Sequence, residues 1–301
     1  MSTTTRSEPL TILAAGASRR LRPVIDELLA RGHRVLVTAR DPSGLSATEL
    51  AGRGAKIVEA DLDDPATLAR AARSVDVVFG AGSPHQAGPD GEARHGVNIA
   101  EAAAKSGAKH LVFSSGAGAD SLTGVPVFES KRTVEQRIRE LGIPHTILAP
   151  VYFMENAFNP WNLDALAAGR FPLPLPPDRR LQQLAVADLA LVAAAVIERG
   201  PTDGNSRIEV AGDEISGEQA AAALTRITGR RFVFHQVALD SLPAGMRSLF
   251  DWLDRVGHHV DVDRLREQFQ DVPWQRFEAW ASAEQRAWPS IRDGAPLRGV
   301  R

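Results

Sequence analysis

The stretch LTILAAGASRRLRPVIDELLARGHRVLVTAR, residues 10–40, decides the fold class. It opens on a short apolar run, Leu10 to Ala15, passes a turn with one glycine, and continues in a helical pattern as far as Gly32. A second β-branched run, Arg34 to Ala39, follows at once. Short, nearly continuous runs of Val, Ile and Leu are typical of parallel strands buried on both faces, so this stretch predicts a strand–helix–strand unit.

The same alternation continues to residue 150. Further strand-like runs are AKIVEA (55–60), VDVVFG (75–80), KHLVFSS (109–115) and HTILAP (145–150). Asp41-Pro42 and Asp64-Pro65 each place an N-cap acid before a proline at the first helical position, and Gly107 and Gly142, like Gly32, stand where helices end. Strands alternating with helices of about ten to fifteen residues predict an α/β fold with a doubly wound parallel sheet.

The pattern changes after residue 150. An aromatic- and proline-rich stretch, 151–180, predicts a loop-and-helix excursion. Beyond it we expect a helix near 186–198, strands at 207–211 and 231–237, a helix from a Ser216/Gln219 capping box to Thr228, and a helical tail over 240–288 with tryptophans at 252, 274, 280 and 288 in its core. The expected first domain is 1–156. The remainder, 157–301, forms a smaller, mainly helical subdomain, except that 186–213 returns to the first domain.

The composition argues against several function classes. A net charge of −2, from 35 basic and 37 acidic residues, offers no basic surface for nucleic acid or an anionic membrane. The chain has no cysteine, and no HExxH or GxSxG motif occurs, so we expect no disulfide, metal site or serine hydrolase chemistry. The apolar run Leu10 to Ala17 is too short for a signal core, and nowhere do about eighteen apolar residues run together. We expect a soluble, cytoplasmic protein.

The turn after the first strand, Ala15 to Arg22, lies where a Rossmann fold places its glycine-rich phosphate turn. Gly16 permits the tight turn, but arginines and a leucine fill positions where close approach to a pyrophosphate favours small residues. The arginines stand near a helix N-terminus, where the helix dipole disfavours cations. Either their side chains extend into solvent, or an anionic group such as a bound phosphate offsets this cost.

The end of the second strand discriminates between the two nicotinamide cofactors. An NAD site usually offers an acid to the ribose hydroxyls there, whereas an NADP site offers an arginine near the 2′-phosphate. The strand is followed by Arg40, and the next residue, Asp41, has a competing role as a helix cap before Pro42. We therefore expect NADP(H). Asp61 and Leu62, just past the third strand, stand either at an adenine edge or in an ordinary turn.

Five phrases of the sequence, from Ile12 to Leu224 and in order, resemble the NmrA-like family of atypical short-chain dehydrogenase/reductases. They are ILAAGASRRLRPVIDELLARGHRVLVTARDPSG, VEADLDDPATLARAARSVDVVF, EARHGVNIAEAAAKSGAKHLVFSSGAGAD, FESKRTVEQRIRELGIPHTILAPVYFMENAFN and RIEVAGDEISGEQAAAAL. The resemblance implies an extended Rossmann domain that binds NADP(H), with a smaller carboxy-terminal part closing over the nicotinamide end. The family's turn usually reads GATGxxG, and its second and third glycines have no counterparts here.

Matched position by position, the resemblance implies a set of cofactor-binding residues. They are Gly16, Ser18, Arg19 and Leu21 at the phosphate turn, Arg40 at the 2′-phosphate, Asp61 and Leu62 at the adenine, Ala81, Gly82 and Ser83 beside the ribose, and Lys131, Tyr152, Phe153 and Asn156 near the nicotinamide. Lys131 matches the family's active-site lysine.

The usual catalytic pair of short-chain dehydrogenases is absent. Those enzymes place a proton-donating tyrosine four residues before the lysine on one helix face, but here that position is Val127, and the only tyrosine of the chain is Tyr152. A lysine buried beside a cofactor can act as acid or base, or hold the ribose hydroxyls. We expect Lys131 and Tyr152 to be catalytic, against the alternative that Lys131 is an exposed helix lysine beside Arg132.

The apolar residues after the sixth strand have two interpretations. They either line an apolar pocket over the nicotinamide, suited to a carbonyl, quinone or enone, or form the seam between the two domains. These residues are Phe153, Phe158, Trp161, Leu173 and Leu175. His85, in the loop beyond the fourth strand, is a further candidate substrate contact.

Three functions follow from these residues. Lys131 and the aromatic segment favour an NADPH-dependent oxidoreductase that transfers hydride to a small apolar carbonyl or quinone-like molecule. The missing tyrosine favours a redox-sensing regulator that binds NADP(H) and a protein partner without turnover. The degenerate turn allows a third interpretation, in which the fold no longer binds a dinucleotide and binds something else. Our first expectation is the oxidoreductase.

Overall fold

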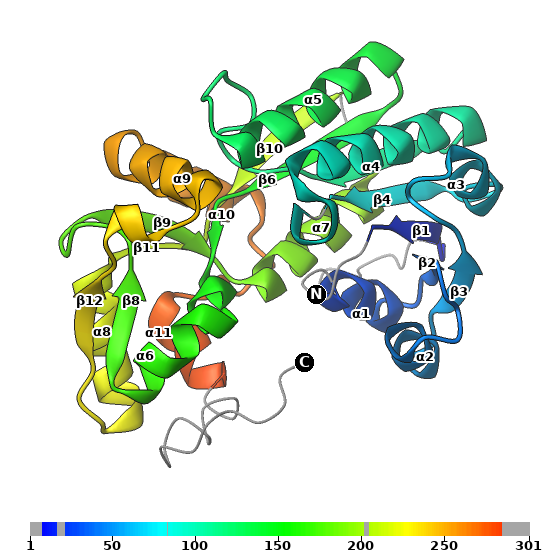
Figure 1. Cartoon of the computed structure of the whole chain (residues 1–301). Coiled ribbons are helices and arrows are strands. Elements are labelled where there is room, and N and C mark those ends of the chain that lie inside the picture. Colours follow the sequence, from blue (N-terminus) through cyan, green and yellow to red (C-terminus); the bar gives the residue numbers. More distant parts are fainter. Residues whose placement is uncertain (1–7, 17–21, 83, 202–204, 285–301) are drawn as a thin grey trace. The chain divides into compact units, whose positions relative to one another are not determined.

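The computed structural model describes residues 8–16, 22–82, 84–201 and 205–284 of the 301 residues. The chain divides into two compact units (Figure 1). Unit 1 contains Met1–Thr123, Val127–Ala149 and Leu189–Glu209, and unit 2 contains Gly124–Pro126, Pro150–Asp188 and Val210–Arg301. Each unit has its own core of buried apolar side chains.

Unit 1 is built on a seven-stranded sheet in the order β10-β6-β5-β4-β1-β2-β3. The strands are β1 (Thr11–Ala15), β2 (Arg34–Ala39), β3 (Lys56–Glu59), β4 (Val77–Ala81), β5 (His110–Ser114), β6 (His145–Pro150) and β10 (Ser206–Val210). All neighbours from β6 to β3 run parallel. The strand order reverses between β1 and β4, and in such sheets ligands bind beyond the carboxyl ends of the strands at this point. The predicted doubly wound α/β fold is confirmed.

Helices cover both faces of this sheet. They are α1 (Arg22–Ala30), α2 (Leu45–Gly52), α3 (Pro65–Ala71), α4 (Pro84–Ser106), α5 (Pro126–Leu141) and α7 (Val186–Arg199). Figure 1 shows α3, α4 and α5 on one face and α1 and α7 on the other. Apolar residues of the first group, including Ile99 and Val134, pack with Leu13 and Leu111 of the strands into one cluster. Burial of this face is the main force holding the layers together.

The predicted helix boundaries of unit 1 are confirmed with one exception. Asp64 caps α3 by accepting a hydrogen bond from the Ala66 amide (2.9 Å), and Gly107 ends α4 with a positive φ of 73°. The cap predicted at Asp41 is wrong, because α2 begins only at Leu45 and Gly44 is its N-cap. The Asp41 carboxylate binds the Ser43 amide and hydroxyl instead, which forms a separate turn before the helix.

Unit 2 contains two small sheets, in the orders β11-β9-β7 and β12-β8. The strands are β7 (Tyr152–Phe153), β8 (Arg170–Leu173), β9 (Arg180–Leu184), β11 (Asp213–Ser216) and β12 (Val233–Gln236). The helices are α6 (Leu163–Ala167), α8 (Gly217–Thr228), α9 (Ala244–Arg255), α10 (Val262–Gln268) and α11 (Phe277–Ala283), with short 3-10 turns at Met154–Phe158, Pro160–Asn162 and Leu239–Ser241. The Ser216/Gln219 capping box is present at the start of α8, as predicted. The predicted helical tail over 240–288 consists of the separate helices α9, α10 and α11, and its Trp288 lies outside the described residues.

The interpretation of 151–180 as loop and helix alone was wrong, because β8 and the start of β9 lie there. Their sequences contain proline, arginine and glutamine rather than a continuous β-branched run. They are strands because distant segments pair with them: Phe171 faces Phe234 across β8 and β12, and Leu181 faces Ile215 across β9 and β11. Tertiary context thus overrides local propensity.

Among the described helices, none combines the length and apolar character that a membrane span requires.

Candidate functional site

The turn after β1 packs directly on the end of β4. Gly16 has a positive φ of 69°, and a Cβ atom at this position would lie only 2.2 Å from the backbone oxygen of Ala81. Glycine is therefore required here for two reasons, the left-handed backbone and the close approach of a neighbouring strand. The structure places two predicted cofactor positions, Gly16 and Ala81, side by side at the sheet's switch point. Ser18, Arg19, Leu21, Ser83 and the side chain of His85 lie outside the described part of the chain.

Arg40 lies directly after β2 and is exposed. It forms no ion pair with another described residue. The neighbouring Asp41 is already engaged, since its Oδ1 accepts hydrogen bonds from the Ser43 hydroxyl (2.6 Å) and amide (2.9 Å), and these bonds lower the pKa of its carboxyl. An available guanidinium and an engaged carboxylate fit a 2′-phosphate better than a ribose diol.

The loop after β3 is fixed to helix α4. The Leu62 carbonyl accepts a hydrogen bond from the Asn98 side chain (2.8 Å). Asp63 pairs with Arg94 (2.8 Å) and lies 3.0 Å from the His95 ring, and these two partners lower the pKa of its carboxyl. The Asp61 side chain forms a hydrogen bond within its own loop, in which its Oδ1 accepts from the Asp63 amide (3.0 Å). The predicted adenine edge, Asp61 and Leu62, is therefore held in place by α4.

Lys131 lies on α5 with its ammonium paired to a buried glutamate. Its Nζ is 2.5 Å from Glu92 Oε1, and the Glu92 side chain is only 1% exposed. The Ser130 hydroxyl donates to the other oxygen of Glu92 (2.6 Å). The Lys131 side chain is 15% exposed, which overturns the alternative of a solvated helix lysine. Val127, at the position of the missing tyrosine, contributes its backbone oxygen as a second acceptor for the Ser130 hydroxyl (3.1 Å).

Two glycines make room for this pair. A Cβ at Gly82 would lie 2.6 Å from Glu92 Cγ, so the loop beyond β4, predicted to pass the ribose, packs on the glutamate. A Cβ at Gly116 would lie 3.1 Å from Lys131 Cδ. The lysine stem and its glutamate thus run between the loops that follow β5 and β4.

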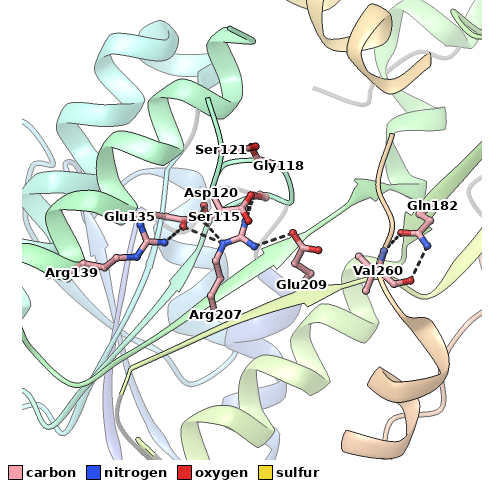
Figure 2. Close-up of polar contacts among 11 residues, drawn as sticks. Ser115, Gly118, Asp120, Ser121, Glu135, Arg139, Gln182, Arg207, Glu209 and Val260 are labelled. Carbon is pink, nitrogen blue, oxygen red and sulfur yellow. Dashed lines mark hydrogen bonds and ion pairs between the residues drawn. The ribbon is translucent and has the colours of Figure 1, made fainter. Parts of the chain in front are cut away.

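A second buried glutamate lies further along α5 (Figure 2). Glu135 is fully buried and accepts hydrogen bonds from the Ser115 hydroxyl (2.6 Å), Arg139 (2.7 Å) and Arg207 (3.2 Å). Arg207, on β10, also donates to the backbone oxygen of Gly116 (3.2 Å). This network connects β10, at the edge of the sheet, to the loop of Gly116, which packs on Lys131.

The predicted nicotinamide and substrate residues after β6 belong to unit 2. Tyr152 pairs with Gln183 in the β7–β9 ladder and makes an edge contact with Phe250, at a centroid distance of 6.0 Å. Phe158 contacts Trp280 with the two rings tilted at 39° and a centroid distance of 5.3 Å, whereas Trp161 is 57% exposed. Leu173 and Leu175 are buried members of the unit 2 core, as is Trp280. Phe153 lies on β7, and Asn156 lies in the following 3-10 turn, where its backbone oxygen accepts from Asn162 (3.1 Å).

Tyr152 also lines a small pocket within unit 2. Its other walls include Asn162, Phe171, Gln183 and Ser216. The sheet beside it is braced by Gln182, whose side-chain amide exchanges two hydrogen bonds with the Val260 backbone, at 3.0 and 2.9 Å (Figure 2). A phenol, two amides and a hydroxyl line this pocket, whose volume of about 10 Å³ has room for about one water molecule.

Several residues of these arrangements could not be found from the sequence. Glu92 precedes Lys131 by 39 positions, and no spacing motif connects them. Glu135 carried a weak signal, because it interrupts the apolar face of α5 next to the buried Val134 and Ile138. Glu155 is a third such residue: its Oε1 accepts from the Val186 amide (2.9 Å) and Trp280 Nε1 (3.2 Å), and burial raises the pKa of its carboxyl.

A family model described as the NmrA-like family matches residues 10–264. The chain belongs to this NmrA-like family. The match spans both units described above, so the turn at Gly16, the Lys131 pair and the Tyr152 strand all lie inside the NmrA-like region.

Curated relatives of this NmrA-like chain include three reductases. The (4-alkanoyl-5-oxo-2,5-dihydrofuran-3-yl)methyl phosphate reductase of Streptomyces griseus is 29% identical, with 76% of this chain and 78% of that protein covered. The NAD(P)H azoreductase of Xenophilus azovorans is 29% identical, with 75% and 79% covered. Quinone oxidoreductase 2 of Escherichia coli is 26% identical, with 79% and 82% covered.

Among solved structures, the negative transcriptional regulator NmrA in complex with NADP has the same fold. The TM-score is 0.77 at 23% identity, and the alignment covers 94% of this chain and 98% of that chain.

Proposed function

We propose that this protein is an NADPH-dependent oxidoreductase that reduces a small apolar carbonyl or quinone-like molecule. The observation that carries the proposal is the buried Lys131–Glu92 pair, set between the loops that follow β4 and β5. Charged side chains are rarely buried without a partner or a function. Lys131 and Glu92 lie beyond the carboxyl ends of β4 and β5, where sheets of this topology bind ligands. The three reductases among the curated relatives support the same reaction class.

The residues of unit 1 fit a nicotinamide dinucleotide. Gly16 allows the tight turn at the switch point, the loop of Asp61 and Leu62 is preformed against α4, and Arg40 offers a guanidinium that no described residue engages. Arg40 supports NADP(H) in particular, because a planar guanidinium binds a phosphate bidentately. The bound nicotinamide would supply the hydride.

Lys131 would act at the nicotinamide end. An ammonium has three N–H donors, and Glu92 takes one of them. The other donors can hold ribose hydroxyls or pass a proton to the oxygen of the reduced substrate. A water molecule would serve as a second proton donor.

The direct test is steady oxidation of NADPH with a panel of quinones and aldehydes. Lys131→Met is expected to lower kcat/KM by about a hundredfold or more, the scale of a lost acid–base or positioning group. Lys109→Met is the matched control, because that lysine is 78% exposed and pairs with Asp76 at the other end of the strands, so its turnover should equal that of the unaltered protein. Full activity in Lys131→Met contradicts the assignment.

The alternative is a redox-sensing regulator that binds NADP(H) and a protein partner without turnover. Val127 at the tyrosine position favours it, because the usual proton donor is missing. Calorimetry with NADPH, run beside the turnover assay, separates the two functions. Micromolar or tighter binding with no turnover across the panel supports the regulator, whereas turnover supports the enzyme.

A further inference from the structure

The position of the Lys131 ammonium is set by groups outside its own helix turn. A lysine side chain has a flexible four-carbon stem and adopts many conformations unless a partner binds its ammonium group. Glu92 Oε1 supplies that partner at 2.5 Å, and it comes from α4, a different helix. The stem is confined as well, because Gly116 approaches it so closely that a Cβ would come within 3.1 Å of Cδ.

Glu92 is itself fixed by burial and by contacts with three residues. Its side chain is 1% exposed, its second oxygen accepts the Ser130 hydroxyl at 2.6 Å, and its methylene packs on Gly82. A buried carboxylate is costly unless it is both paired and hydrogen-bonded, and here each oxygen has its own partner. Glu92 therefore has one stable arrangement, and that arrangement fixes the ammonium.

The contact with Gly82 adds a connection to the predicted ribose loop. Because Glu92 Cγ would be only 2.6 Å from a Cβ at Gly82, the loop beyond β4 cannot shift inward without moving the glutamate. The same helix fixes the loop after β3 through Asn98. Helix α4 thus supports both predicted ends of the dinucleotide site, with Glu92 at one end.

We propose that Glu92 is the positioning residue of the site: it orients Lys131 so that two ammonium N–H groups face the nicotinamide end of NADPH. A glutamate–lysine pair from two helices thus positions the ammonium in a chain that lacks the tyrosine–lysine pair on one helix. Ser130 completes the unit by holding the second oxygen of the glutamate. This inference rests on the proposed function.

The test is a double-mutant cycle on the full chain, read by NADPH calorimetry. Glu92→Gln keeps the size of the side chain but removes its charge, and it should weaken NADPH binding about five- to tenfold, as is typical of strongly coupled residues in contact. In a Lys131→Met background, Glu92→Gln should have no further effect, because the glutamate acts only through the lysine. Glu101→Gln, on the same helix and in surface pairs with Lys105 and Arg137, is the matched control and should bind NADPH normally.

Each result of the cycle has a defined meaning. Equal losses from Glu92→Gln in both backgrounds overturn the inference, because the glutamate would then act without Lys131. No NADPH binding by the unaltered protein overturns the proposed function, and the inference with it. Lys131→Met leaves Glu92 buried without its cation, so thermal melting accompanies each titration. If that variant does not fold, Lys131→Gln, whose amide can still donate to Glu92, takes its place in the cycle.

Discussion

At the scale of single residues, we expect Arg40 to decide which nicotinamide cofactor the protein prefers. Arg40→Ala removes the guanidinium expected at the 2′-phosphate, which NADPH has and NADH lacks. We expect NADPH affinity to fall about tenfold or more, the loss of one charge-assisted phosphate contact, while NADH affinity stays within about twofold. Calorimetric titration of both cofactors measures the ratio. Equal losses for the two would contradict the role of Arg40, and Arg53→Ala, whose side chain is exposed and pairs with Asp26, is the control.

Gly16 allows a second prediction at this scale. Gly16→Ala would force a Cβ to within 2.2 Å of the Ala81 oxygen and place a side chain at positive φ. We expect a loss of about 3 kcal/mol in the free energy of unfolding, from backbone strain plus overpacking. Gly32→Ala is the matched control, since it also has positive φ but no atom within 4 Å of the new Cβ, and it should cost only about 1 kcal/mol. Urea unfolding of both variants measures the difference, and equal losses would show that the contact with β4 is unimportant.

At the scale of elements, β10 joins unit 1 both as a sheet strand and through Arg207. The strand adds an edge to the sheet, and Arg207 joins Glu135 of α5 to the Gly116 backbone. Arg207→Met would leave a fully buried carboxylate with one cation fewer, so we expect a loss of about 3 kcal/mol or more in unfolding free energy. Arg137→Met on α5, which breaks surface pairs with Glu101 and Glu140, should cost less than about 1 kcal/mol. Similar urea midpoints for the two variants would argue against this ranking.

The amino ends of β5 and β6 make stability depend on pH. Burial, and then the charge of His145 nearby, lower the pKa of His110 to about 4, below the ordinary 6.5 that it regains on unfolding. The folded state therefore favours neutral His110, and its contribution is complete above pH 6.5 and is lost as pH falls from 6.5 toward 4. We expect this to cost on the order of 2–3 kcal/mol by the low end of the window.

Urea unfolding at several pH values checks this expectation. His110→Gln should flatten the decline over that window, whereas His235→Gln, at an exposed position on β12, should leave the slope unchanged. A decline of the same steepness in His110→Gln would exclude His110 as its source. Burial also lowers the pKa of His258, in unit 2, to about 4, so this residue adds a loss of stability with the same sign as pH falls.

At the scale of the whole molecule, the sequence predicts unit 1 well and unit 2 less well. The bounds of β2 and β6 match the predicted runs, because parallel strands buried on both faces leave a continuous apolar signature. β8 and β9 leave no such signature, since Pro172, Gln182 and Gln183 become strand residues only when β12 and β11 pair with them. Local patterns therefore could not reveal these two small sheets.

The candidate site divides in the same way. Gly16, Arg40 and Lys131 could be proposed from the sequence because a turn, a strand end and a family motif mark their positions. Glu92 and Arg207 could not, because each meets its partner across many residues of chain through the packing of two elements. Helix α4 has a break at Gly88 and Pro89, but nothing in its sequence marks Glu92 among its acids, and only the fold shows that this glutamate pairs with the lysine.

The division of the chain has a consequence for how the protein is made. Unit 1 is not one continuous segment, because Pro150–Asp188 of unit 2 lies in the sequence between Ala149 and Leu189–Glu209. On the ribosome, strands β1 to β6 emerge long before β10, and until then β6 is an unprotected sheet edge that invites pairing with other nascent chains. A fragment that stops at residue 150 or 156 keeps that edge permanently, so we expect it to aggregate on expression, whereas a fragment through residue 210 carries every strand of the large sheet.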